Sequence, residues 1–275
     1  MKNTKILVLG SNGKTGRRVV ERLEKIENVE IRLGSRNEKI PFDWEKPETW
    51  EKILQDINAV YITFQPDLAS PSAADSIQNF TLLATEAGVQ KIVLLSGRGE
   101  KEAQVCEEIV KTNAKNWTIV RASWFNQNFS ESIFLDPVLT GIVALPRAEA
   151  LEPFVDADDI ADVVTASLLD EKHNGQTYEL TGPRLLKFEH IGNEIANATG
   201  RNITFQALSL NEYVQMLREY QVPEDFIWLV NYLFEQVLDG RNSNVTSDIE
   251  KVLGRKAKDF SAYAKETAET GIWDI

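Results

Sequence analysis

Short apolar runs alternate with amphipathic stretches over the first 123 residues of the chain. The runs lie at 5–10, 30–34, 39–43, 59–64, 91–96 and 117–121. Between them, apolar side chains recur at three- and four-residue steps, as at Val19, Val20, Leu23 and Ile26 and again at Ile77, Phe80, Leu83, Ala84 and Ala87. Strands that alternate with helices are typical of a parallel sheet covered by helices. The pattern therefore predicts an α/β protein with a six-stranded, doubly wound Rossmann sheet.

Beyond residue 124 this alternation stops. Residues 141–146 and 177–180 have the composition of strands, 156–169 that of a helix that starts with an aspartate, and the later segments are mainly helical. One later helix carries a wide apolar stripe that is either core or a substrate lid or dimer face, namely Phe226, Leu229, Val230, Leu233, Phe234 and Val237. We expect a cofactor-binding Rossmann domain over 1–123 and a smaller, mostly helical substrate-binding region over 124–275, with some strands returning to the sheet.

Composition and charge narrow the classes of partner. The hydrophobic content of 43% is enough for a full core, and the formal charge of −12 disfavours nucleic acid and anionic lipid. No apolar stretch reaches the ~18 residues that a membrane span needs. One cysteine and two histidines provide neither an internal disulfide nor a good zinc site. We expect a cytoplasmic, metal-free protein whose partner is a small molecule; a homodimer or a protein partner stays open.

A glycine-rich loop follows the first predicted strand directly. It reads Gly10-Ser11-Asn12-Gly13-Lys14-Thr15-Gly16, a GxxGxxG pattern that opens a predicted helix. Glycines let the backbone turn tightly and approach a pyrophosphate, whose charge then lies on free N–H groups and the positive end of the helix. Because it lies between a strand and a helix, this loop predicts a dinucleotide site rather than a purely structural turn.

The residues after the second predicted strand bear on the choice of dinucleotide. NAD sites usually carry an acidic side chain there to hold the ribose 2′-hydroxyl, but this chain has Ser35 and Arg36. A guanidinium can bind a 2′-phosphate, and Lys14 or Arg17 could add a second positive charge. We therefore expect NADP(H) as the cofactor. The alternative, that Arg36 is an ordinary surface charge, stays open.

Several motifs together resemble one family. GSNGKTG, then GSR, PFDW, KIVLLSG, WTIVRASWFNQNFSE, PFVDADDIADV and TYELTGP are similar to the NmrA-like branch of atypical short-chain dehydrogenases/reductases. The likeness covers nearly the whole chain, and within the branch the chain most resembles bacterial relatives of the festuclavine and agroclavine dehydrogenases. The stretch from Arg121 to Glu131 is much more specific than the glycine loop.

The resemblance implies roles for individual residues. The phosphates would be held by Gly10, Asn12, Gly13, Lys14, Thr15 and Gly16, and the 2′-phosphate by Ser35 and Arg36. Asp43, which ends the third predicted strand, would face the adenine. The ribose and nicotinamide would lie against Phe64, Gln65 and Pro66 and against Ser96 and Gly97. Asp156 and Asp159 would be structural.

The proton donor of ordinary short-chain dehydrogenases is missing. Those enzymes use a YxxxK pair, but none of the six tyrosines of this chain is followed four residues later by lysine. Hydride transfer can still proceed to an acceptor that needs little proton help, such as an iminium ion, an activated enone or a quinone. If an acid is needed, Ser96 and Ser123 are weak candidates, and Cys106 is expected to be a structural thiol rather than a nucleophile.

Aromatic and amide side chains follow the last strand of the predicted domain. Trp124, Phe125, Asn128 and Phe129 would form an apolar substrate pocket, unless Trp124 and Phe125 only pack the joint between the two predicted halves of the chain. Two functions remain open: an NADPH-dependent oxidoreductase for a small activated electrophile, and a non-catalytic NADP(H)-binding redox sensor of the NmrA type. An isomerase or epimerase is disfavoured because that chemistry normally needs the absent tyrosine.

Overall fold

The computed structural model describes residues 4–275 and divides into two compact units. We expected one boundary near residue 123, but both units are discontinuous in sequence. The first unit comprises the described residues up to Ala122, Ala157–Leu180 and Asp248–Arg255. The second comprises Ser123–Asp156, Thr181–Ser247 and Lys256–Ile275.

The first unit is built on a parallel sheet of six strands in the order β2-β1-β3-β4-β5-β7. Its strands are β1 (Thr4–Leu9), β2 (Val29–Gly34), β3 (Ala59–Ile62), β4 (Lys91–Gly97), β5 (Trp117–Ala122) and β7 (Gln176–Leu180). Ile6 of β1 pairs with Ile31 on one side and with Ala59 on the other. The chain therefore reverses its direction across the sheet between β1 and β3, which makes this position the topological switch point.

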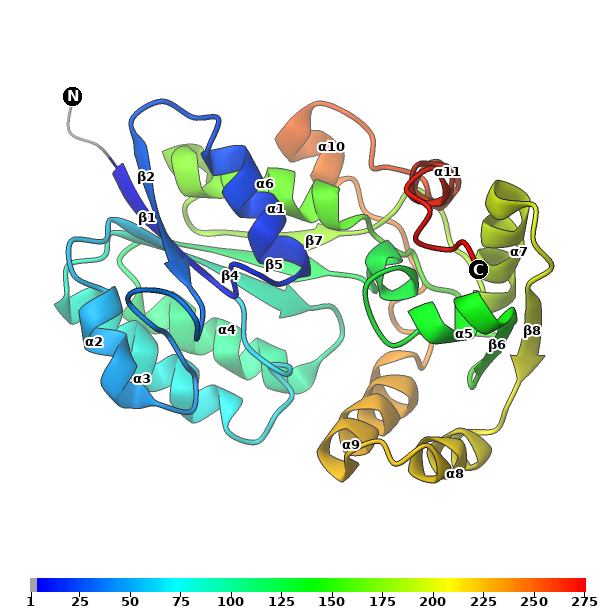
Figure 1. Cartoon of the computed structure of the whole chain (residues 1–275). Helices are drawn as coiled ribbons and strands as arrows, with labels where there is room; N and C mark the ends of the chain where they lie inside the picture. The colour runs from blue at the N-terminus through cyan, green and yellow to red at the C-terminus, as the bar shows by residue number, and fades with distance from the viewer. Residues whose placement is uncertain (1–3) are drawn as a thin grey trace. The chain divides into compact units, whose positions relative to one another are not determined.

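Helices cover both faces of this sheet, as Figure 1 shows. On one face lie α1 (Lys14–Leu23), α6 (Ala157–Leu169) and α10 (Asp248–Leu253), and on the other α2 (Trp50–Ile53), α3 (Ala73–Glu86) and α4 (Lys101–Asn113). Strand residues on both faces are fully buried, among them Leu7, Val8, Val60 and Tyr61. Burial on both faces explains why the strands read as continuous apolar runs. The predicted doubly wound α/β fold is confirmed.

The prediction of a strand at 39–43 is wrong. These residues are irregular, and the sixth strand of the sheet is instead β7. Pro41 has no N–H to donate to a ladder, while Phe42 donates its N–H to the carbonyl of Ser35. The side chain of Phe42 is buried against Trp50 and Phe80. The apolar residues of this segment therefore anchor a loop to the core and pair with no strand.

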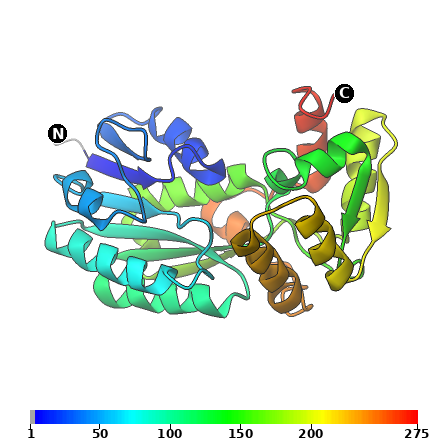
Figure 2. The same ribbon diagram turned by 60° about the horizontal axis from the view of Figure 1, so that its bottom comes forward.

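The second unit is mainly helical. Its elements are α5 (Leu135–Thr140), β6 (Ile142–Leu145), α7 (Phe188–Thr199), β8 (Thr204–Ala207), α8 (Leu210–Glu219), α9 (Glu224–Tyr232) and α11 (Phe260–Ala268). β6 and β8 form a two-stranded parallel ribbon, and α7 lies beside α11 (Figure 2). The core of this unit is rich in aromatic rings, with Phe129, Phe154 and Phe188 in mutual contact.

The predicted apolar stripe at 226–237 belongs largely to this core. α9 continues into a π-helical turn at Leu233–Val237. Val230 and Phe234 are buried in the core of the second unit, whereas Trp228 is 46% exposed.

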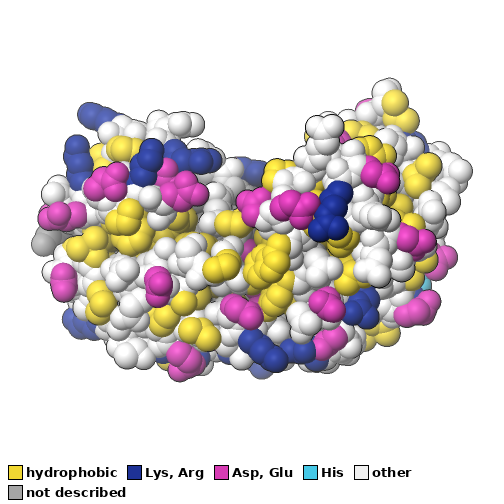
Figure 3. Space-filling view, turned by 90° about the horizontal axis from the view of Figure 1, so that it is seen from below, with side chains coloured by type: hydrophobic (Ala, Val, Ile, Leu, Met, Phe, Trp, Pro, Cys, Tyr) yellow, Lys and Arg dark blue, Asp and Glu magenta, His cyan; other side chains and the backbone are white. Residues whose placement is uncertain are grey.

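On the face drawn in Figure 3, basic side chains are interspersed with acidic ones. Of the helices in residues 4–275, none is both long and apolar enough to cross a bilayer.

Candidate functional site

The glycine loop turns tightly between β1 and α1. Gly10 has a φ of +64°, and its carbonyl accepts a hydrogen bond of 2.8 Å from the N–H of Gly13. Gly13 precedes the first helical residue, and no side chain of the described residues 4–275 caps the helix there. The first turn of α1 contains no acidic residue. The N–H groups at this helix start, together with the positive end of the helix, therefore favour an anion.

Gly16 lets the first turn of α1 approach the loop very closely. A Cβ atom on Gly16 would stand 2.1 Å from the carbonyl oxygen of Gly10 and 3.1 Å from the Cα of Ser11. The hydroxyl oxygen of Ser11 is buried and has no hydrogen-bond partner among residues 4–275. The tight backbone and this unpartnered hydroxyl both fit a loop shaped around the phosphates of a dinucleotide.

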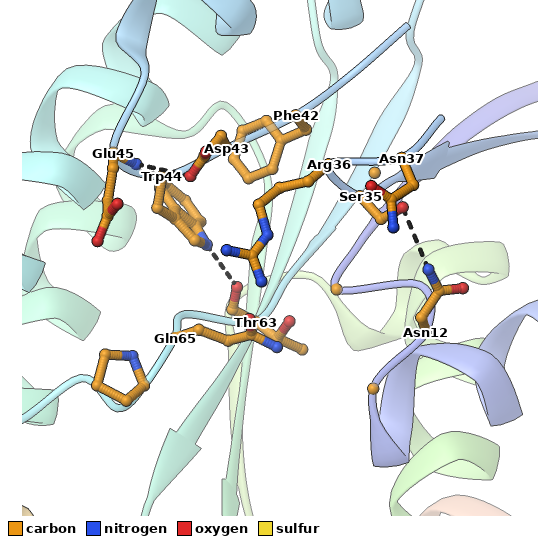
Figure 4. Close-up of a pocket in the computed structure, with 14 residues that line it drawn as sticks. Asn12, Ser35, Arg36, Asn37, Phe42, Asp43, Trp44, Glu45, Thr63 and Gln65 are labelled. Carbon is orange, nitrogen blue, oxygen red and sulfur yellow. Dashed lines mark hydrogen bonds between the residues drawn. The ribbon is translucent and has the colours of Figure 1, made fainter. Parts of the chain in front are cut away.

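A cavity of about 620 Å³ opens beside this loop (Figure 4). It lies where β1, β2 and β3 end, which is the carboxyl edge of the sheet at the switch point. Open α/β sheets bind ligands at this place. The cavity is lined by Gly10, Asn12, Gly13, Gly34, Ser35, Arg36, Asn37, Phe42, Asp43, Trp44, Glu45, Thr63, Gln65 and Pro66.

Arg36 extends into this cavity from the end of β2, with its guanidinium directed toward Thr63 in Figure 4. Its neighbour Ser35 accepts a hydrogen bond of 3.2 Å from the side-chain amide of Asn12 on the glycine loop. Within residues 4–275 no carboxylate pairs with Arg36, which is exposed. The guanidinium is therefore available for an anion in the cavity.

An aromatic wall forms the opposite side of the cavity. The indole N–H of Trp44 donates to the carbonyl of Thr63 at 3.0 Å, and its ring lies 4.9 Å from those of Phe42 and Phe64. Asp43, between the two aromatic residues, accepts a hydrogen bond from the N–H of Glu45. The wall was not predicted as part of the site, although the motif PFDW contains both rings.

The structure brings together about half of the expected cofactor residues. Eight of them line the cavity: Gly10, Asn12, Gly13, Ser35, Arg36, Asp43, Gln65 and Pro66. The others lie outside its lining, namely Lys14, Thr15, Gly16, Phe64, Ser96 and Gly97. Of these, Thr15 is buried with its hydroxyl bonded to Tyr61, and Phe64 packs against the core.

Ser96 is bonded into a charged network at the end of β4. Its hydroxyl donates to a carboxylate oxygen of Glu107 at 2.7 Å. Glu107 is fully buried and also accepts two hydrogen bonds from Arg121, at 2.8 and 2.6 Å. These bonds to Glu107 raise the pKa of Arg121. Because the Ser96 hydroxyl already donates this hydrogen bond to Glu107, it is poorly placed to donate a proton to a substrate.

Two further carboxyl groups meet close to this network. The side chains of Asp67 and Glu100 are hydrogen-bonded to each other, and burial together with the charge of Asp67 raises the pKa of Glu100 well above its usual range. Cys106 lies near Asp67 and Glu107, and its burial raises its pKa to about 12. A thiol with such a pKa stays protonated at neutral pH, in agreement with a structural cysteine.

The residues expected at the substrate all lie in the second unit, and some of them belong to its core. The ring of Trp124 stacks on that of Phe134 at 6.2 Å and contacts Phe188. Trp124, Phe125 and Asn128 are half-buried, whereas Ser123 and Phe129 are buried. The backbone around Phe125 is held by a short parallel bridge to Val155. Phe129 packs among the aromatic rings of the core.

Comparison with known proteins bears on this site. The family described as NAD(P)H-binding matches residues 10–171. The chain is 28% identical to prestalk A differentiation protein A of Dictyostelium discoideum, over 95% of this chain and 92% of the other. It is also 28% identical to festuclavine synthase I of Penicillium roqueforti, over 97% and 99%. The triphenylmethane reductase of Citrobacter sp., solved in complex with NADP(H), has a TM-score of 0.81 at 18% identity and covers 96% of this chain and 99% of its own.

Proposed function

Because the chain belongs to the NAD(P)H-binding family, we propose that it is an NADPH-dependent oxidoreductase. It transfers hydride to a small activated electrophile, such as an iminium ion, an enone or a quinone, and does so without a YxxxK pair. The similarity to a festuclavine synthase, over nearly the full length of both chains, supports this reaction class.

The observation that carries the proposal is the position of Arg36. This residue follows β2 and reaches into the cavity beside the glycine loop without a carboxylate partner within the described chain. A guanidinium at this position matches the 2′-phosphate of NADPH, and a charge-assisted contact of this kind is worth about 1.5–3 kcal/mol. The loop from Gly10 to Gly16 would hold the pyrophosphate, and the wall of Phe42 and Trp44 would contact the adenine.

When bound, the nicotinamide of the cofactor supplies the hydride. The chain itself orients the two reactants and excludes water. We infer that Ser96 and Gly97, at the end of β4, border the nicotinamide side, and that Glu107 and Arg121 keep the Ser96 hydroxyl fixed there. We further propose that Trp124, Phe125 and Asn128 contribute to an apolar substrate pocket, with Phe129 supporting it from the core.

The proposed enzyme is tested by offering NADPH together with a panel of quinones, enones and cyclic iminium ions. NADPH binding is measured first by calorimetric titration, and oxidation is then followed by the loss of reduced-nicotinamide absorbance. Turnover with at least one acceptor class, above the rate without protein, is the expected result. Tight NADPH binding with no oxidation of NADPH by any acceptor of the panel would contradict the proposed oxidoreductase activity.

A non-catalytic NADP(H) sensor is the second candidate. The observation that favours it is that no tyrosine is followed four residues later by lysine, so the usual proton donor of short-chain dehydrogenases is absent. A sensor would bind NADPH and NADP⁺ with different affinities and would pass this difference to a protein partner.

We also propose a cytoplasmic location, since a single cysteine leaves no disulfide within the chain.

A further inference from the structure

Asp67 and Glu100 form a carboxyl pair, called the acid pair below. Their carboxyl groups lie within interaction range of each other, and burial disfavours two negative charges side by side, so protonation of one of the two is favoured. Glu100 is 8% exposed. One oxygen of Asp67 already accepts a hydrogen bond of 2.8 Å from the N–H of Ala69. This bond favours the charged form of Asp67 and leaves the proton on Glu100.

The acid pair lies at the carboxyl edge of the sheet. Asp67 directly follows Gln65 and Pro66, which line the cavity. Glu100 precedes the first residue of α4 and folds back onto the last residue of β4, since a Cβ atom on Gly97 would stand 1.9 Å from its Oε1. The pair therefore belongs to the strand ends at which an open α/β sheet binds its ligands.

The groups around Glu100 favour the neutral form of its carboxyl group. The charged side chains that affect it are Asp67 from the loop after β3 and Glu102 and Glu107 from α4, all of them acidic. Cys106, on the same helix, faces Asp67 and Glu107 and is itself protonated. Burial and these negative charges raise the pKa of Glu100 well above its usual range and thereby favour the protonated form that a proton donor needs.

Two other hydroxyl groups of the neighbouring strands β3 and β4 are already engaged as donors. Ser96 donates to Glu107, and Tyr61 donates to Thr15. Neither can give its proton away without breaking a buried hydrogen bond. Within residues 4–275 no cation forms an ion pair with Asp67 or Glu100, and Arg121 is occupied by Glu107 and Glu179.

We propose that Glu100 is the proton donor that replaces the missing tyrosine, and that Asp67 is its positioning residue. This inference rests on the proposed oxidoreductase function. With an enone, the hydride forms a C–H bond, the π electron pair moves onto the carbonyl oxygen, and that oxygen takes the proton as the O–H bond of Glu100 breaks. Water then returns a proton to the acid pair. With an iminium ion the electron pair moves onto the cationic nitrogen, and no proton is needed.

Glu100→Gln tests the proposal, because an amide keeps the shape and can still donate to Asp67 but releases no proton. We expect enone turnover to fall by about 100-fold or more, as for the loss of a general acid, and iminium turnover to change by less than about threefold. In the parent protein, enone turnover should fall as pH rises through the pKa of Glu100, and iminium turnover should not. Glu108→Gln, an exposed position of the same helix, is the matched control and should leave both rates unchanged.

A second readout is independent of turnover. The infrared spectrum of the parent protein at neutral pH should contain the C=O band of a protonated, buried carboxyl group, which shifts in D₂O. The band should be absent in Glu100→Gln and retained in Glu108→Gln. Three results for Glu100→Gln would overturn the donor role alone: an equal loss of turnover with both acceptors, no loss of turnover with either, or a C=O band unchanged from that of the parent protein. A parent protein that binds NADPH but reduces neither acceptor would refute the oxidoreductase function, and the donor role with it.

Discussion

The hydroxyl group of Tyr61 donates a hydrogen bond to the hydroxyl oxygen of Thr15, with 2.9 Å between the two oxygens. Both side chains are buried. Tyr61 belongs to β3 and Thr15 to the first turn of α1, directly after the glycine loop. This bond therefore ties the start of the helix that faces the cavity to the strand on the other side of the switch point.

Tyr61→Phe should lower the free energy of unfolding by about 1 kcal/mol, the usual net value of one intramolecular hydrogen bond. Urea unfolding measures the change. Thr15→Val and the double variant complete a mutant cycle, in which the two substitutions should cost less together than the sum of the single changes. Strict additivity would mean that the two hydroxyl groups do not stabilise each other.

Arg36→Ala should weaken NADPH binding by roughly 10- to 150-fold, which corresponds to the loss of one charge-assisted contact of about 1.5–3 kcal/mol. NADH lacks the 2′-phosphate, so its affinity should stay nearly unchanged. Calorimetric titration of both cofactors provides the comparison. Lys39→Ala is the matched control, because Lys39 is an exposed cation of the same loop that does not line the cavity. Equal losses for NADPH and NADH would rule out recognition of the 2′-phosphate by Arg36.

Gly16→Ala should weaken both cofactors alike. The added Cβ atom would stand 2.1 Å from the carbonyl oxygen of Gly10, and backbone atoms cannot give way as a flexible side chain can. The loop must therefore shift away from its present shape, in which we propose that it binds the phosphates, and we expect at least a tenfold loss of affinity. Gly192→Ala is the control in a helix, where the new Cβ atom meets its nearest neighbour at 3.7 Å. Unchanged binding by folded Gly16→Ala would show that the close approach is not needed.

Local patterns revealed five of the six strands of the sheet, but they did not show which segment forms the sixth. β1, β3 and β4 read as apolar runs because their side chains are buried on both faces. The segment at 39–43 has the same local composition, yet Phe42 enters the core from a loop. The place of β7 depends on its pairing with β5, where Val120 lies opposite Tyr178. A partner so distant in sequence cannot be read from either segment alone.

The candidate site shows the same difference between local and distant features. The glycine loop and Arg36 follow directly from short motifs after the first two strands. The contact of Trp44 with Thr63 and the acid pair of Asp67 and Glu100 join segments that meet only in the folded sheet. One signal could have pointed to the acid pair: each carboxyl group lies a few residues after one of two neighbouring strands, β3 and β4.

Trp124→Ala should separate substrate binding from cofactor binding. NADPH affinity should change by less than about twofold, since the phosphate loop and Arg36 lie in the first unit, while turnover should be lost if the ring forms part of the substrate pocket. Because the ring stacks on Phe134, we also expect unfolding to become easier by about 2 kcal/mol, below the 3–5 kcal/mol of a fully buried aromatic residue. Trp228→Ala, an exposed tryptophan of the same unit, is the control. Turnover that survives Trp124→Ala would remove this residue from the substrate site.

The acid pair should make the protein less stable as pH rises. The pKa of Glu100 is raised in the folded state by burial and by Asp67, so the folded chain holds a proton that the unfolded chain releases. Its contribution to stability is complete below the pKa of an unfolded glutamate, about 4.3, and is lost as pH rises toward the folded pKa. Urea unfolding from pH 5 to pH 9 should therefore show a decline in the parent protein that is smaller in Glu100→Gln and unchanged in Glu108→Gln. Parallel curves for the parent protein and Glu100→Gln would mean that Glu100 is ionised in the folded state, because only a bound proton links its folding to pH.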